Sequence, residues 1–167
     1  MRLSVARIKR WGESVDYEFV TETVAAHPLA AVRRRVMIGE VSTSWRPALD
    51  RVWAFLRSNG SLRTDGHNVF VYHHPAALDL PMEVDFGVQV VGAFAGDGEV
   101  VSRQTPAGPV ASTLHIGPYE RLGDAHSAIH SWRAAHGRSF AGISWEIYGD
   151  WNDDPAKLEV RVLYLLD

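Results

Sequence analysis

One segment with the character of a β-strand carries a carboxylate among apolar neighbours. Glu146 lies in ISWEIYG, residues 143–149, between a tryptophan and an isoleucine. Successive side chains of a strand point to opposite faces, so Ser144, Glu146 and Tyr148 are expected on one face. A carboxylate among aromatic rings attracts cationic ligands, and when desolvated it can act as a general base. The alternative is a solvated glutamate that pairs with an arginine.

Further aromatic residues are expected to face Glu146 across a cleft. The segment VFVY at 69–72 matches WEIY at 145–148, 76 positions later, so that Phe70 corresponds to Glu146 and Tyr72 to Tyr148. If the strand face that carries Trp145 packs on the helices, the face with Glu146 looks away from them into the cleft. Phe70 and Tyr72 would then face it from the other half of the chain.

Two more tyrosines are candidates for ligand contact. Tyr119 follows Gly117 and Pro118 where a helix is expected to begin. Its side chain is either a buried residue that fixes the start of the helix or a hydroxyl that faces the cleft. Tyr164 lies in the last predicted strand, although aromatic residues in a chain with six tryptophans more often belong to the core.

The histidines offer a weaker metal signal. His126 and His130 are four residues apart on a predicted helix, a spacing that suits zinc ligands. No glutamate follows His126, as an HExxH motif would require, and no third ligand is specified. We therefore expect a structural or surface role for this pair, and no metal or cofactor.

Composition excludes several classes of function. The 167 residues include no cysteine, which rules out disulfides, thiolate zinc sites and cysteine nucleophiles. The net charge of −3 gives no reason to expect binding to DNA or an anionic membrane, and the run Arg33–Arg35 is expected to be a solvated strand end. The phosphate-binding GxGxxG and GxxxxGK[ST] motifs are absent. Without an apolar signal segment or membrane span, a cytoplasmic protein is expected.

Hydrophobic periodicity predicts an α+β fold. Helices are expected at 42–59 and 120–136, each with an apolar stripe at helical spacing. Strands are expected at 17–24, 29–38, 68–73, 84–91, 99–104, 110–116, 143–149 and 158–166. Strand, helix, strand, strand occurs twice, which predicts duplicated β-α-β-β modules with pseudo-twofold symmetry. Antiparallel sheets would carry two helices on one side and leave a central ligand cleft.

The sequence resembles the GyrI-like family, which includes the effector-binding domains of bacterial multidrug-responsive activators. The resemblance rests on IGPYERL at 116–122, WEIY at 145–148, and HPL at 27–29 with the helix that follows it. It covers about 17–167, with repeat halves of about 17–98 and 99–167, and leaves 1–16 as an N-terminal extension.

The resemblance implies the SHS2-type repeat and a pocket that takes hydrophobic, aromatic, often cationic drug-like molecules. Glu146 would be the buried glutamate, with Tyr148, Tyr119, Phe70, Tyr72 and Tyr164 lining the pocket. Two alternatives remain open. One is a hydrolase that opens cyclopropanoid DNA-alkylating compounds with Glu146 and Tyr119, and the other is a protein-interaction role such as inhibition of DNA gyrase or partnership with a regulator. A monomer without direct DNA binding is expected.

Overall fold

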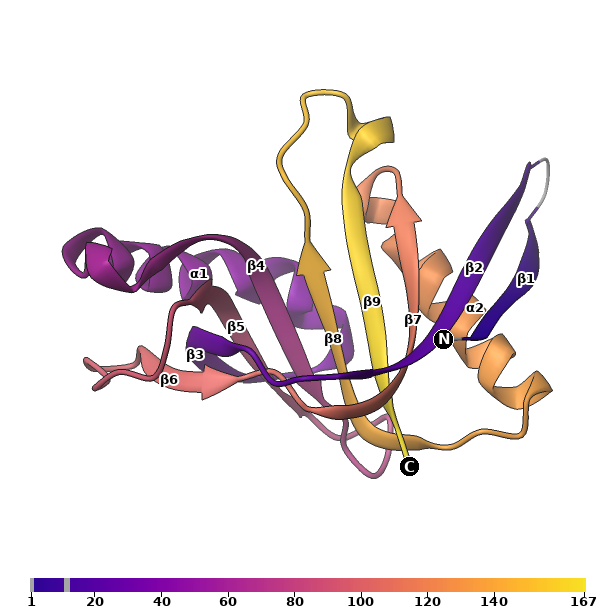
Figure 1. Cartoon of the computed structure of the whole chain (residues 1–167), viewed down its shortest axis with the longest axis horizontal. Helices are drawn as coiled ribbons and strands as arrows, with labels where there is room; N and C mark the ends of the chain where they lie inside the picture. Colours follow the sequence, from indigo (N-terminus) through magenta and orange to yellow (C-terminus); the bar gives the residue numbers. More distant parts are fainter. Residues whose placement is uncertain (1, 11–12) are drawn as a thin grey trace. The chain divides into compact units, whose positions relative to one another are not determined.

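The structure is a computed structural model that describes residues 2–10 and 13–167. The chain forms two compact units, and neither is a continuous stretch of sequence (Figure 1). The first comprises residues 1–24, 107–141 and 146–167, and the second comprises 25–106 and 142–145.

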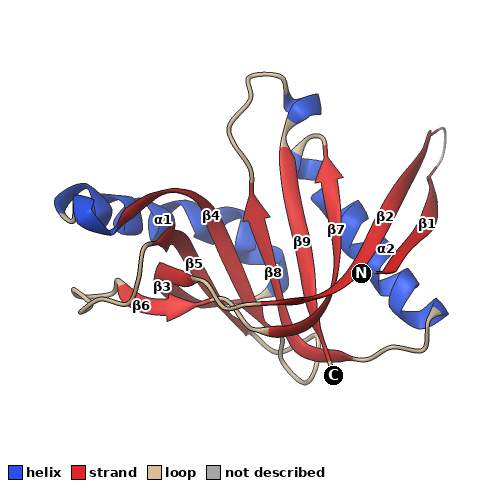
Figure 2. Cartoon of the chain, in the orientation of Figure 1, coloured by secondary structure: helices blue, strands red, loops and turns tan. Residues whose placement is uncertain are grey.

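The first unit is an antiparallel sheet with one helix. Its strands are β1 (Arg2–Arg10), β2 (Glu13–Val24), β7 (Gly108–Ile116), β9 (Glu159–Leu166) and the outer parts of β8 (Phe140–Tyr148). Helix α2 (Leu122–Ala135) packs on β7, β2 and β9 (Figure 2). The expected apolar stripe of this helix is confirmed, since Leu122, Ala125, Ile129 and Trp132 are all buried.

The second unit has the same plan. Its strands are β3 (Pro28–Val36), β4 (Arg63–His73), β5 (Met82–Val90) and β6 (Val101–Gln104), joined by residues 142–145 of β8. Helix α1 (Val41–Ser58) packs on β3 and β5 through Leu49, Val52 and Leu56, three residues of its predicted stripe.

The strand order within each unit shows the duplication. In the second unit the order is β4-β5-β3-β6, and in the first it is β8-β9-β7-β2, with β1 added beside β2. The series β3-α1-β4-β5 therefore corresponds to β7-α2-β8-β9. This confirms the predicted repeat of a β-α-β-β module; the second repeat gains β6 beside β3, and the first gains β2 beside β7, with β1 beside β2.

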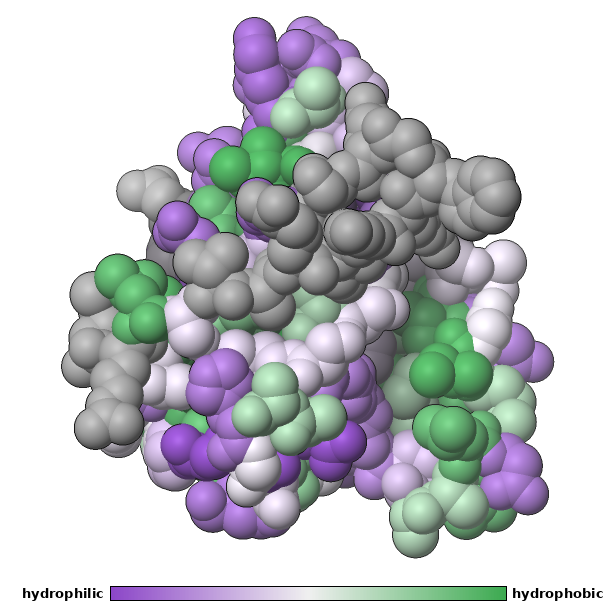
Figure 3. All heavy atoms as spheres, turned by 90° about the vertical axis from the view of Figure 1, so that its right-hand side faces the viewer, coloured by the Kyte–Doolittle hydropathy of each residue, from purple (hydrophilic) through white to green (hydrophobic). Residues whose placement is uncertain are grey.

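The N-terminal segment was expected only as an extension without an assigned structure. β1 instead pairs antiparallel with β2, from Arg2 opposite Thr21 to Arg10 opposite Glu13. A helix with the length and apolar character of a bilayer span is absent from the described part of the chain. Several large apolar side chains reach the surface, among them Leu78, Leu114, Ile116 and Trp151, and Figure 3 shows apolar groups among polar ones on one face.

Candidate ligand-binding site

Glu146 is a buried carboxylate whose hydrogen-bond partners include Tyr148 and His126 of the first unit. It lies near the C-terminal end of strand β8, and the residue is 4% exposed. The hydroxyl of Tyr148 donates to Oε2 at 2.7 Å, and Nε2 of His126 lies 2.7 Å from Oε1. An ionised carboxylate only accepts, so the histidine donates at Nε2. Burying this charge is tolerable because both of its oxygens are hydrogen-bonded.

His126 joins the carboxylate to a second tyrosine. Its Nδ1 lies 2.8 Å from the hydroxyl of Tyr164, a buried residue of β9. A neutral imidazole with its proton on Nε2 satisfies both contacts, because Nδ1 then accepts from the phenol. The result is a continuous chain of hydrogen bonds through Tyr164, His126, Glu146 and Tyr148.

Tyr119 stands beside this chain. Its ring meets that of Tyr148 edge to face, with the centroids 5.5 Å apart. Among the described residues its hydroxyl has no hydrogen-bond partner, and burial raises the pKa of this phenol. The hydroxyl therefore stays protonated in neutral solution and is available as a donor.

A turn that requires glycine places Tyr119. Gly117 has φ of +140°, which favours glycine, and its amide donates to the carbonyl of Leu158. Nε2 of His115 lies 3.0 Å from the carbonyl oxygen of Pro118 and holds the next peptide. Tyr119 then opens a short 3₁₀ turn, Tyr119–Arg121, that leads into α2.

One sequence-based expectation about this strand was conditional: the Glu146 face of β8 would look away from the helices if the face with Trp145 packed on them. Glu146 instead binds His126 of α2, and Tyr148 packs against the core that α2 shares with the sheet. Strand alternation identifies which side chains share a face, but it does not identify the face that meets the helix.

His126 is the site residue that sequence reasoning missed, because it was given only a structural or surface role. It adjoins two buried positions of the α2 stripe, Ala125 and Ile129, so it sits at the edge of the face turned toward the sheet. His130, which has the spacing of a second zinc ligand, instead packs against the rings of Phe140 and Tyr164. Burial is the main cause of the lowered pKa of His130.

The remaining predicted site residues lie in the second unit. Phe70 of β4 is buried, meets Phe86 edge to face at 4.9 Å and contacts Trp45 of α1 at 6.3 Å between centroids. Tyr72 is also buried, with its ring 6.5 Å from that of His74. Four of the six predicted residues, Glu146, Tyr148, Tyr119 and Tyr164, thus gather in one unit, and the contribution of Phe70 and Tyr72 to the same site stays a prediction.

Comparisons with solved structures identify proteins with the same fold. The C-terminal domain of EcmrR is 18% identical, with a TM-score of 0.73 over 90% of this chain and 98% of that one. SAV2435 bound to tetraphenylphosphonium is 10% identical, with a TM-score of 0.66 over 89% and 93%. A hydrolase from Listeria innocua is 11% identical, with a TM-score of 0.60 over 89% and 91%. These likenesses show the fold.

Among curated proteins, none matches the chain significantly. Residues 17–165 match the family described as the GyrI-like small molecule binding domain. That range includes both repeats and all of the candidate site residues. The chain belongs to the GyrI-like family of small-molecule-binding domains.

Proposed function

We propose that this protein binds hydrophobic aromatic cations, with Glu146 as the counter-ion. The observation that carries the proposal is a carboxylate that is 4% exposed and hydrogen-bonded to Tyr148 and, through His126, to Tyr164, in a small-molecule-binding domain. A buried negative charge contributes more to binding a desolvated cation than a surface charge does, because the surrounding dielectric constant is low. The structural neighbour bound to tetraphenylphosphonium provides a fitting probe.

The residues around Glu146 supply the rest of the recognition. With neutral His126, the network of His126, Tyr148 and Tyr164 carries one net negative charge while fixing the position of the carboxylate. The tyrosine rings add stacking and cation–π attraction of about 0.5–2 kcal/mol each. Such contacts tolerate different ring shapes, so several unrelated drug-like cations would bind, and sequestration of such compounds would be the function.

A hydrolase is a second candidate, favoured by the pairing of His126 with Glu146 and by the Tyr119 hydroxyl, which no described residue hydrogen-bonds. In a cyclopropane conjugated to a carbonyl, Glu146 would take a proton from water while the water oxygen bonds to a ring carbon. The strained C–C bond breaks, and its electrons pass to the carbonyl as an enolate. Tyr119 would donate a hydrogen bond to that oxygen before the enolate carbon takes up a proton.

Titration of the protein with tetraphenylphosphonium and with neutral triphenylphosphine oxide tests the proposal. The two probes share aromatic rings and differ in charge, and the six tryptophans report binding by fluorescence. We expect the cation to bind more tightly than the neutral compound. Equal affinity, or no binding of either, would contradict the counter-ion role.

Mass spectrometry of a mixture with a cyclopropanoid compound separates the two candidates. A product heavier by one water molecule, formed only with active protein, would establish the hydrolase. Binding without any product would leave sequestration as the function.

A further inference from the structure

The sheet of the second unit has a charged cluster on the side away from α1. Phe70 and Phe86 lie opposite each other and face α1, because Phe70 contacts Trp45 of that helix. Asp85 precedes Phe86, so it points to the other face, where it pairs with Arg33 across β3 and β5. This cluster takes no part in the proposed site at Glu146.

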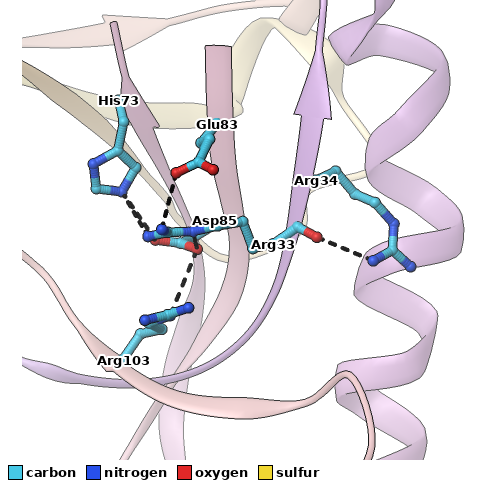
Figure 4. Close-up of polar contacts among 6 residues, drawn as sticks. All are labelled: Arg33, Arg34, His73, Glu83, Asp85 and Arg103. Atoms are coloured by element: carbon cyan, nitrogen blue, oxygen red, sulfur yellow. Dashed lines mark hydrogen bonds and ion pairs between the residues drawn. The ribbon is translucent and has the colours of Figure 1, made fainter. Parts of the chain in front are cut away.

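Asp85 is the centre of this cluster (Figure 4). Nε and NH2 of Arg33 donate to its two oxygens at 2.7 and 2.8 Å, and Nε2 of His73 donates to Oδ2 at 3.0 Å. Burial raises the pKa of this carboxyl, but the hydrogen bonds from Arg33 and His73 outweigh it and lower the pKa to about 2. NH1 of Arg33 also donates to Glu83 at 3.0 Å. The negative charge of Asp85 is therefore compensated by Arg33, and the carboxylate fixes Arg33 and His73 in place.

Arg33, His73 and Asp85 help to line a hollow with a volume of about 420 Å³. Its wall consists of Pro28, Arg33, His73, Asp85, Ala93, Ser102, Arg103 and Gln104. The side chain of Asp85 is 5% exposed, whereas that of Arg103 is 41% exposed. The acid thus lies behind the surface, and basic side chains face the hollow. Its volume falls in the range of small-molecule pockets.

Arg103 is the cation in this wall whose terminal NH groups are available to a ligand as donors. Its Nε lies 3.9 Å from Oδ1 of Asp85, which is an ion pair but too long for a hydrogen bond. Within the described chain, its terminal NH groups have no protein partner, and Arg103 belongs to the edge strand β6. A guanidinium fork of this kind matches the two oxygens of a carboxylate or phosphate.

We propose that this hollow binds a small organic anion, a carboxylate or a phosphate monoester, with Arg103 as its bidentate partner. Pro28 and Ala93 give the organic part an apolar surface. The hollow would thus take ligands of the opposite charge from those proposed for Glu146, at a separate place in the second unit.

Isothermal titration of the full chain at low salt with benzoate, phenyl phosphate and inorganic phosphate tests this site. We expect one organic anion per chain, and at least tenfold weaker binding in Arg103→Gln. Arg103→Lys keeps the charge without the fork and should lie between the two. Arg57→Gln is the matched control, since Arg57 is an exposed arginine in the last turn of α1, outside the hollow.

Unchanged affinity in Arg103→Gln, or a loss of the same size in Arg57→Gln, would overturn the proposal, as would the absence of binding at millimolar concentrations. Inorganic phosphate binding as tightly as phenyl phosphate would support the anion site and identify the phosphate group as the part recognised. Tighter binding of the organic anions would support the contribution of the apolar wall. Thermal unfolding of each variant confirms that it is folded.

Discussion

Nε2 of His126 and Oε1 of Glu146 lie 2.7 Å apart and join α2 to β8 within the first unit. The bond connects the carboxylate to a helix that is anchored in the core through Ala125 and Ile129. The charge of Glu146 is therefore held in one position before any ligand arrives. A fixed charge needs little reorganisation on binding, and this favours affinity.

Replacing His126 should destabilise the protein. His126→Ala removes a hydrogen bond to a buried carboxylate, at an expected cost of about 1–3 kcal/mol. Urea unfolding measures this cost. Ser127→Ala changes the neighbouring exposed position and should alter the free energy of unfolding by less than about 0.5 kcal/mol. Equal stabilities of the two variants would show that the His126–Glu146 bond contributes nothing to folding.

Removing the hydroxyl of Tyr119 should distinguish ligand binding from hydrolysis. Because it has no protein partner among the described residues, Tyr119→Phe should change stability by less than about 0.5 kcal/mol. Cation binding should persist, since the ring remains. Any hydrolysis of a cyclopropanoid compound should slow by about 10²-fold or more through loss of the oxyanion donor. Hydrolysis at the wild-type rate would remove Tyr119 from the mechanism.

Because of Asp85, the free energy of unfolding should depend on pH in the acid range. Its pKa is lowered from 3.8 to about 2 in the folded protein, so the ionised form stabilises the fold above roughly pH 4. This contribution of about 2 kcal/mol is lost as the pH falls through 2, where both states hold the proton. Urea unfolding between pH 7 and 2 should show it. Asp85→Asn should be less stable near neutrality and should approach the wild type in acid, whereas a constant difference would contradict the shift.

Substitution by alanine should change stability in opposite directions at two glycines, one just before α2 and one within it. Gly117 has φ of +140°, and an added Cβ would come no closer than 3.7 Å to other atoms, so Gly117→Ala introduces backbone strain of about 1–3 kcal/mol without a clash. Gly123 lies in α2 with open space around it, and Gly123→Ala should stabilise by about 0.5–1 kcal/mol. Thermal unfolding of the pair compares them, and shifts of the same sign would refute this interpretation of the turn.

The helices were predictable because their signals are local, and the repeat was predictable because the same order of elements occurs twice. The stripes that contain Leu49 and Ile129 repeat at helical spacing, and their burial confirms both helices. The burial of Glu146 is consistent with its apolar flanks in sequence. The strand β1 was missed, because its segment 2–10 is rich in arginine and lysine and lacks strict alternation.

The polar pairs were not predictable, because they depend on how distant segments align. Arg33 was expected in a solvated strand end, yet it binds Asp85, 52 residues away. That contact requires the register of β3 against β5, in which a shift of one residue would move every side chain to the other face. The pairing of His126 with Glu146 likewise depends on how α2 packs on its sheet, which no local pattern specifies.

The most direct test of the account compares wild type with Glu146→Gln. The two side chains have nearly the same shape and differ in charge, so titration with tetraphenylphosphonium and triphenylphosphine oxide isolates the effect of the carboxylate. We predict that the variant binds the cation at least about tenfold more weakly, a loss of about 1.4 kcal/mol, and binds the neutral compound as before. Unchanged affinity for the cation, or equal losses for both compounds, would contradict the role of Glu146 as the counter-ion.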